Sequence, residues 1–270
     1  MKFMLTSVLL ATIAIASPAA EITVKGRVIW DTKLNGPIPK RAKLVANKDA
    51  DVAAKDDDFY DEDWVIAPIG NGTTGSMRDC VVILTPTPAK GARISPKFKP
   101  EDISAVAMKA KQKDVVIDQP CCRFIPHCSG TIEGQKLIIK NSSTVPHNAK
   151  YVSSELEGNP LIPPGGEFTV PTPLPAMRSP ISLSCSIHGW MKAYIYVFDH
   201  PYFYVTLKDG KFEIPNVPAL EGKLNLVLRK PDGLFSGGVA GRLGITIDPA
   251  MAKDGVLDLG DVPFLAEIKK

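Results

Sequence analysis

Proline and glycine interrupt this chain so often that many short strands are favoured over long helices. The 270 residues contain 24 prolines and 21 glycines, and both residue types end helices and favour turns. After Val115 the stretches between them are short runs rich in β-branched and aromatic residues: VVID, TIEGQKLIIK, HNAKYV, GEFTV, ISLSC, KAYIYVF, YFYVTL, KFEIPNV, KLNLVLR, GITI and VLDLG. Such runs, bounded by turn residues, are typical of strands. The pattern predicts an all-β sandwich, and the lack of a regular repeat of 20 to 50 residues argues against a propeller or a solenoid.

A few further elements are predicted outside this region. Strands are expected near Ile22–Trp30 and at Cys80–Leu84, where CVVIL follows a glycine-rich turn. Pro100 and the acidic residues after it favour the start of a short helix, because proline suits the first turn and acids complement the helix dipole. The sequence LKDGK at 207–211 predicts an Asp-Gly hairpin between the runs on either side of it.

The charge balance argues against nucleic acid as a partner. The chain has 32 basic and 29 acidic residues, a formal net charge of +3, and no basic surface is evident in the sequence. Residues 56–64, DDDFYDEDW, combine acids with aromatics. We interpret them as a solvated loop anchored by Phe59, Tyr60 and Trp64, with a docking or calcium-binding loop as the alternative. EF-hand spacing is absent.

The first residues have the layout of a secretory signal. Lys2 precedes an apolar run from about Phe3 to Ala16, followed by small residues and a proline before Glu21. The run is shorter than the roughly 20 residues of a membrane-spanning helix, and no cysteine follows it to carry a lipid. We therefore predict a signal peptide at residues 1–20 and a protein that is exported, periplasmic or extracellular, and soluble after cleavage, with no membrane span.

Five cysteines follow that segment, an odd number, so in an oxidising compartment at least one thiol lacks a disulfide partner within the chain. Three of them lie in QPCCRFIPHCSG, and Cys185 lies apart, near a histidine. We favour a disulfide between Cys80 and one of Cys121, Cys122 or Cys128, since a vicinal Cys121–Cys122 bond would be strained. The alternative is a second metal site made by Cys122, His127 and Cys128. His200, in FDHPYF, is interpreted as structural.

The segment ISLSCSIHGWM holds the residues that point to chemistry. Cys185, His188 and Met191 follow a C-x2-H-x2-M spacing on one short loop between two predicted strands. His147 starts another strand upstream, so a second imidazole could complete a trigonal set of two histidines and a cysteine with a weaker axial sulfur. This donor set suits type 1 copper. Zinc is the main competitor, although a thioether is a poor zinc ligand.

These motifs resemble the cupredoxin, or type 1 blue copper, family. The Pro146-His147-Asn148 segment is similar to plastocyanin, and CSIHGWM matches the ligand loop of amicyanin in spacing. The resemblance covers roughly Thr131 to Phe198 and implies one copper ion, held by His147, Cys185, His188 and Met191. It also implies a hydrogen bond from the Asn148 side chain to Ser186, and an exposed edge of His188 where a partner docks. Trp190 would belong to that docking surface or would shield the metal from water.

The stretch from 202 to 233 resembles carboxypeptidase regulatory-like and transthyretin-like β modules. Their T-x-x-D-G-x-F-x-I-x-N-V-P signature fits the residues from Thr206 to Pro218. The resemblance implies a scaffold without catalytic residues. We therefore expect a cupredoxin-like Greek-key sandwich with an N-terminal elaboration at 21–198 and a small β-sandwich module at 199–270.

The function expected from these features is one-electron transfer by an exported copper protein with a redox partner protein. No serine-histidine-acid set and no paired-carboxylate signature is recognisable, so an enzyme is not expected. One alternative is an extracytoplasmic module that binds carbohydrate or a cell-surface protein, with a structural metal or none. Another is a copper carrier or sensor that passes the ion on.

Overall fold

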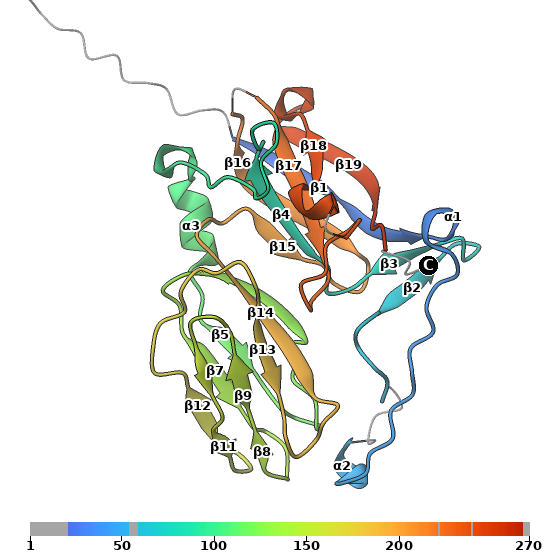
Figure 1. The fold of residues 1–270 in the computed structure, drawn as a ribbon, viewed down its shortest axis with the longest axis vertical. Helices are drawn as coiled ribbons and strands as arrows, with labels where there is room; N and C mark the ends of the chain where they lie inside the picture. The colour runs from blue at the N-terminus through green and yellow to red at the C-terminus, as the bar shows by residue number, and fades with distance from the viewer. Residues whose placement is uncertain (1–20, 54–58, 221, 239, 267–270) are drawn as a thin grey trace, which may run out of the picture.

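A computed structural model describes residues 21–53, 59–220, 222–238 and 240–266, and the chain folds into two stacked β-sandwich lobes (Figure 1). The all-β prediction is confirmed. The predicted signal peptide at 1–20 lies outside the described residues. Among the residues described, no helix is long and apolar enough to cross a membrane.

The lower lobe in Figure 1 is a sandwich built from the middle of the chain. Its larger sheet has the order β10 (Glu157–Gly158), β9 (Lys150–Val152), β13 (Ile181–Ser184), β14 (Lys192–Phe198) and β6 (Cys128–Ile132). The second sheet has the order β12 (Glu167–Thr169), β7 (Leu137–Lys140) and β5 (Val115–Ile117), and a separate ladder joins β11 (Leu161–Ile162) to β8 (His147–Asn148). Ile139 of β7 and Ile195 of β14 belong to one buried cluster, so the two sheets enclose a common core.

The upper lobe combines strands from both ends of the described chain. One sheet has the order β16 (Lys211–Pro218), β1 (Glu21–Asp31), β3 (Thr74–Met77) and β2 (Ile66–Ile69), with β19 (Val256–Pro263) also paired to β1. The other has the order β15 (Phe203–Val205), β4 (Val81–Pro86), β17 (Leu224–Arg229) and β18 (Ile245–Ile247). The predicted domain boundary between 21–198 and 199–270 stays a prediction. Strands β1 and β4, from the first part of the chain, pair with strands β16, β17 and β19 of the C-terminal stretch.

Strand β4 joins the two lobes because it is buried on both faces. Val82 and Leu84 belong to the core of the upper lobe. Val81 and Ile83 point the other way, since side chains alternate along a strand, and belong to a cluster that also contains Tyr196 of β14. This double burial explains why the predicted strand reads as a continuous apolar run rather than an alternating one.

The helices are short. They are α1 (Thr32–Asn35), α2 (Ala50–Ala53) and α3 (Ala105–Lys111), with 3-10 turns η1 (Pro100–Asp102), η2 (Ala240–Leu243) and η3 (Pro249–Met251). The helix predicted after Pro100 is present but begins later. The Ser104 side chain accepts a hydrogen bond from Ala107 N at 3.3 Å and so caps α3.

The hairpin predicted at 207–211 is wrong, although its turn is present. Gly210 has a φ of 69°, and its N–H donates to the Leu207 carbonyl at 2.9 Å. The flanking strands do not pair with each other: β15 pairs with β4, whereas β16 pairs with β1. The turn therefore connects one sheet of the upper lobe to the other. Pairing with strands that are distant in sequence, β4 and β1, determines this arrangement.

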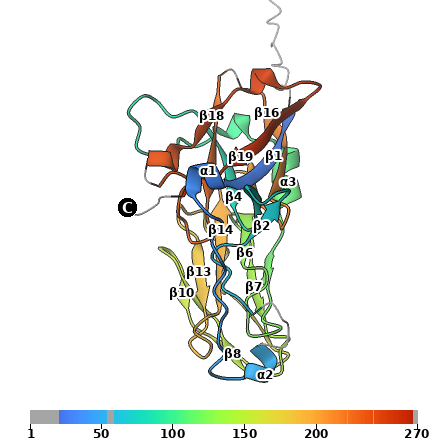
Figure 2. The same cartoon turned by 90° about the vertical axis from the view of Figure 1, so that its right-hand side faces the viewer.

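Between α1 and β2 the chain leaves the upper lobe, and we call residues 36–65 the excursion. Figures 1 and 2 both show its two legs, in blue and cyan, running along the lower sandwich to α2 near the far end. The legs are joined by hydrogen bonds from Leu44 N to Phe59 O at 3.0 Å and from Asp61 N to Ala42 O at 2.9 Å. The excursion thus extends from the upper lobe to the end of the lower lobe that contains β8.

The structure also yields a prediction about acid stability. His200 is buried among the rings of Phe98, Phe198 and Tyr202, and its Nδ1 accepts a hydrogen bond from Tyr202 N at 3.2 Å. Burial lowers its pKa to about 4, while the charge of Asp199 opposes the shift. The unfolded chain, with a histidine pKa near 6.5, therefore binds more protons between pH 6.5 and 4, so the free energy of unfolding falls as the pH falls through that window.

We expect His200 to remove about 3 kcal/mol of stability between pH 7 and pH 4. Urea unfolding at several pH values measures this for the wild type and for His200→Asn, whose side-chain oxygen can accept the same hydrogen bond. The variant should be less stable at neutral pH because ring contacts are lost, but its stability should depend less on pH. An unchanged pH dependence would contradict the assignment.

Candidate metal centre

The loop between β13 and β14 gathers three of the predicted ligands. The two strands are antiparallel, and the pair Ser184–Lys192 closes the loop that contains Cys185, His188 and Met191. Within it, Met191 N donates to the His188 carbonyl at 2.9 Å, which forms a tight turn. The C-x2-H-x2-M spacing is therefore the length of one short connection between paired strands.

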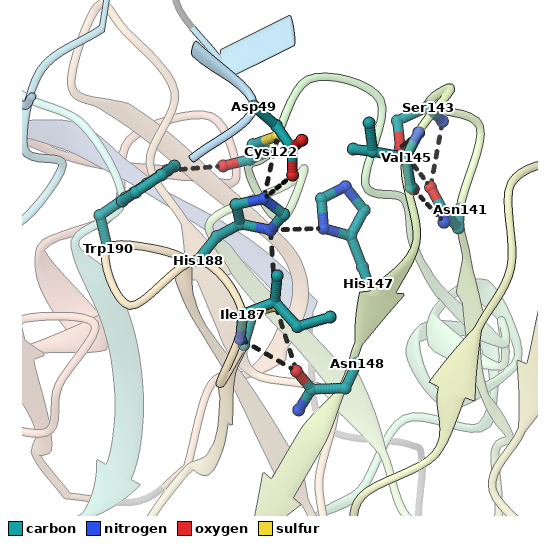
Figure 3. Close-up of polar contacts among 11 residues, drawn as sticks. Asp49, Cys122, Asn141, Ser143, Val145, His147, Asn148, Ile187, His188 and Trp190 are labelled. Carbon is teal, nitrogen blue, oxygen red and sulfur yellow. Dashed lines mark hydrogen bonds and ion pairs between the residues drawn. The ribbon is translucent and has the colours of Figure 1, made fainter. Parts of the chain in front are cut away.

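A second segment supplies His147, the first residue of β8. His147 is paired with Ile162 of β11, and the Asn141 side chain donates to the carbonyls of Val145 and Ile162, each at 2.9 Å. These bonds close the loop before His147 and hold β8 against β11, and Figure 3 shows the contact of Asn141 with Val145. The imidazole is thereby fixed at one end of the lower sandwich.

The two histidines contact each other through their Nδ1 atoms. His147 Nδ1 lies 3.0 Å from His188 Nδ1, and both side chains are fully buried (Figure 3). Cys185 Sγ lies 3.8 Å from the same His188 nitrogen. Met191 is buried in the core cluster that also includes Cys185. The structure thus brings the ring nitrogens of His147 and His188 together, places the Cys185 thiol beside His188 and leaves Met191 in the same core.

Burial also sets the charge state of this cluster. It lowers the pKa of His147 to about 4, and the neighbouring His188 adds to the shift. The His147 imidazole is therefore neutral at neutral pH. A neutral imidazole offers a nitrogen lone pair, which is the form that binds metal ions.

Asn148 connects the two ligand segments. Its side-chain oxygen accepts hydrogen bonds from Ser186 N at 2.8 Å, Ile187 N at 3.3 Å and Cys185 Sγ at 3.3 Å. The Asn148 amide nitrogen also lies 3.4 Å from Ser186 Oγ. One side chain of β8 therefore fixes the start of the loop, in the arrangement that the family resemblance implies.

The opposite edge of the His188 ring has two neighbours that the sequence did not predict. Asp49, in the excursion just before α2, places Oδ2 2.8 Å from His188 Nε2. Cys122 Sγ lies 3.9 Å from the same nitrogen. Cys122, His147 and His188 are the one group of three candidate ligands, within 4.8 Å of one another, found in the described part of the chain. No spacing motif could have revealed Asp49, which is 139 residues from His188.

Cys122 and Cys185 differ in their position around His188. Cys185 lies near Nδ1, on the side of His147, whereas Cys122 lies near Nε2, beside Asp49. Burial, with a contribution from the Asp49 charge, raises the pKa of Cys122 to about 12. Cys185 lies beside the His188 nitrogen that faces His147, whereas the Cys122 sulfur lies within 4.8 Å of a ring nitrogen of each histidine.

The exposed His188 edge implied by the resemblance is absent. The side chain has no exposed surface because Asp49 and Cys122 lie against Nε2. Trp190 is half-buried, donates from Nε1 to the Cys122 carbonyl at 3.0 Å and contacts the Phe59 ring edge-on at 5.4 Å. Docking of a partner at His188 and Trp190 stays a prediction, but His188 itself is covered.

The structure also corrects the assignments of the remaining cysteines. Cys80 is a free thiol that donates to the Arg229 carbonyl at 3.3 Å in the upper core, so the predicted disulfide to Cys121, Cys122 or Cys128 is wrong. Burial raises the pKa of the Cys80 and Cys128 thiols above their usual range.

The alternative metal set of Cys122, His127 and Cys128 is not assembled either. Cys122 belongs to the lower core, whereas Cys128 belongs to the cluster between the lobes. His127 Nδ1 instead lies 3.0 Å from the Lys192 carbonyl oxygen. Neighbours in sequence thus take up separate environments.

The donor set fits a copper ion. Two imidazole nitrogens bound to one metal ion at about 2 Å each lie about 3 Å apart, which matches the Nδ1–Nδ1 distance of 3.0 Å. Two histidines and a cysteine, with a methionine in the same core, are the donors preferred by blue-copper sites.

Comparison with known proteins finds similarity in structure only. No protein-family model matches the chain, and no curated protein matches it in sequence. Among solved structures, a purple cupredoxin from Nitrosopumilus maritimus is 18% identical over 31% of this chain and 99% of its own, with a TM-score of 0.27. A reduced amicyanin variant is 19% identical over 34% of this chain and 88% of its own, with a TM-score of 0.28.

A Cu-containing nitrite reductase from Thermus scotoductus is 18% identical over 42% of this chain, with a TM-score of 0.29. The match spans only 25% of that enzyme's length. The structural neighbours are thus cupredoxins with low scores and partial coverage.

Replacing Asn148 tests its connecting role. In Asn148→Ala two loop N–H groups and the Cys185 thiol lose their acceptor, so the free energy of unfolding of the metal-free protein should fall by about 2 kcal/mol. Ser186→Ala removes an exposed hydroxyl and only its long, 3.4 Å contact with the Asn148 amide, so it should cost less than about 0.5 kcal/mol. Urea unfolding measures both. Equal stability of the two variants would show that Asn148 does not fix the loop.

Proposed function

We propose that this protein is a copper-binding electron carrier. The observation that supports this most strongly is the 3.0 Å approach of the His147 and His188 Nδ1 atoms, with the Cys185 thiol 3.8 Å from His188 Nδ1. Each of these side chains is buried, so the donors converge in a region with little access to water. His147, Cys185 and His188 bind copper in this proposal, with Met191 as a weaker axial ligand.

Bound copper supplies a one-electron change between Cu(II) and Cu(I), with a one-electron redox protein as donor or acceptor. The protein's own residues keep the donor atoms in fixed positions during that change. Asn148 ties β8 to the ligand loop, and the β13–β14 pairing closes the loop at its base. A site held by paired strands needs little reorganisation, which favours rapid transfer over chemistry on a substrate.

The space on one side of the site is small. The pocket beside Trp190 and Met191 admits about one water molecule. Phe59 and Trp190 pack together over this side of the core. Export through the segment at 1–20, docking of a redox partner and the regulatory-like module at 199–270 complete the proposal.

The visible spectrum after Cu(II) addition tests the proposal. Charge transfer from a thiolate to Cu(II) is intensely coloured, so the wild type should turn blue to green. Cys185→Ser should lose the colour because the thiolate is gone. Cys122→Ser removes the other thiol beside His188 and should keep the colour, which makes it the matched control.

Two results would contradict the proposal. A wild type that binds no copper and stays colourless would leave a β-sandwich binding module as the better account. Loss of colour in Cys122→Ser with retention in Cys185→Ser would move the thiolate ligand to the other edge of His188.

A further inference from the structure

The outer edge of His188 is held by an acid from a distant part of the chain. Asp49 Oδ2 lies 2.8 Å from Nε2, which is the distance of a charge-assisted hydrogen bond. His188 has no exposed surface, and the Asp49 side chain is 27% exposed. Figure 3 shows Asp49 and His147 on different edges of the His188 ring.

This contact decides which ring nitrogen carries the proton. A carboxylate can only accept, so Nε2 must be the donor and carry a hydrogen. In a neutral imidazole the other nitrogen, Nδ1, is then a bare lone pair. Nδ1 is the atom that faces His147 and Cys185, so the tautomer that Asp49 selects leaves this nitrogen available to a metal ion.

The backbone places Asp49 for this contact. Its φ is 50°, in the left-handed region that aspartate tolerates better than most residues. Its carbonyl accepts hydrogen bonds from Val52 N at 3.1 Å and Ala53 N at 2.9 Å, which form the turn of α2. The side chain therefore leaves a defined turn rather than an open loop.

Neighbouring residues anchor this turn to the core around the proposed ligands. Ala53 and Phe59 are buried in the cluster that contains Cys185 and Met191. Phe59 also contacts Trp190, the residue between His188 and Met191. Packing at the end of α2 and at Phe59 thus holds the segment that carries Asp49 against the core around His188.

We propose that Asp49 is a positioning residue for the copper ligand His188, fixing its Nε2–H form and favouring oxidised over reduced copper. The inference rests on the proposed copper site and extends it to the excursion. A carboxylate behind a ligating histidine raises the basicity of the ligand, and loss of such a partner typically weakens metal binding 10- to 100-fold.

Charge explains the preference for the oxidised state. Cu(II), the Cys185 thiolate and the Asp49 carboxylate sum to zero charge, whereas the same groups with Cu(I) carry one negative charge. An uncompensated charge is costly in a buried site. Removing the Asp49 charge should therefore weaken Cu(II) binding more than Cu(I) binding.

Three variants of the full chain separate the charge from the hydrogen bond. Asp49→Asn keeps an acceptor and tolerates the left-handed backbone, but removes the charge. Asp49→Gly removes both without backbone strain. Asp51→Asn removes the same charge from an exposed residue of α2 and is the matched control.

Competition with chelators measures the affinities for Cu(II) and Cu(I). We expect Asp49→Asn to bind Cu(II) about 10-fold more weakly and Asp49→Gly up to about 100-fold more weakly, with smaller losses for Cu(I). A tenfold loss confined to Cu(II) corresponds to a rise in reduction potential of about 59 mV. Asp51→Asn should stay within about twofold of the wild type. Equal losses in Asp49→Asn and Asp51→Asn, or wild-type affinities in both Asp49 variants, would overturn the proposal.

Nitrogen-15 NMR of the metal-free protein tests the hydrogen bond independently of copper. In the wild type His188 Nε2 should carry a proton with the downfield shift of a bond to a carboxylate, and Asp49→Gly should lose that signal. A wild type without an Nε2–H overturns the inference even if copper binds. Failure of the wild type to bind copper, with the NMR signal present, instead overturns the proposed function and limits Asp49 to fixing the ring.

Discussion

The site depends on the contact between two buried imidazoles, His147 and His188. Their Nδ1 atoms face each other at 3.0 Å, and each ring is held in place by the strands next to it. On one side, the β8–β11 ladder and the Asn141 bonds fix His147. On the other, the β13–β14 pairing fixes the loop of His188. The lower sandwich is therefore the frame that holds the two donors together.

The rest of the molecule contributes through the excursion. Residues 36–65 begin and end in the upper lobe, next to α1 and β2, yet they place Asp49 against His188 and Phe59 against Trp190. β4, buried on both faces, packs the upper lobe against the lower one. The chain outside the 115–198 sandwich thus completes the surroundings of His188 and covers its outer edge.

Local patterns in the sequence predicted much of this structure. Apolar alternation and turn residues located most strands, and C-x2-H-x2-M located the loop of Cys185, His188 and Met191, because both depend on neighbours along the chain. Asp49 and Cys122 could not be placed beside His188, since their positions depend on packing between distant segments. The same reason explains the errors: the turn at 207–211 joins two different sheets, and Cys80 is buried in the upper core, hydrogen-bonded to Arg229.

X-ray absorption at the copper edge of the loaded full chain tests the central claim most directly, because it identifies the atoms bound to the metal. The account predicts two imidazole nitrogens and one short thiolate sulfur, with the sulfur absent in Cys185→Ser and retained in Cys122→Ser. A shell of nitrogen and oxygen atoms alone, or a sulfur that disappears only in Cys122→Ser, would contradict it.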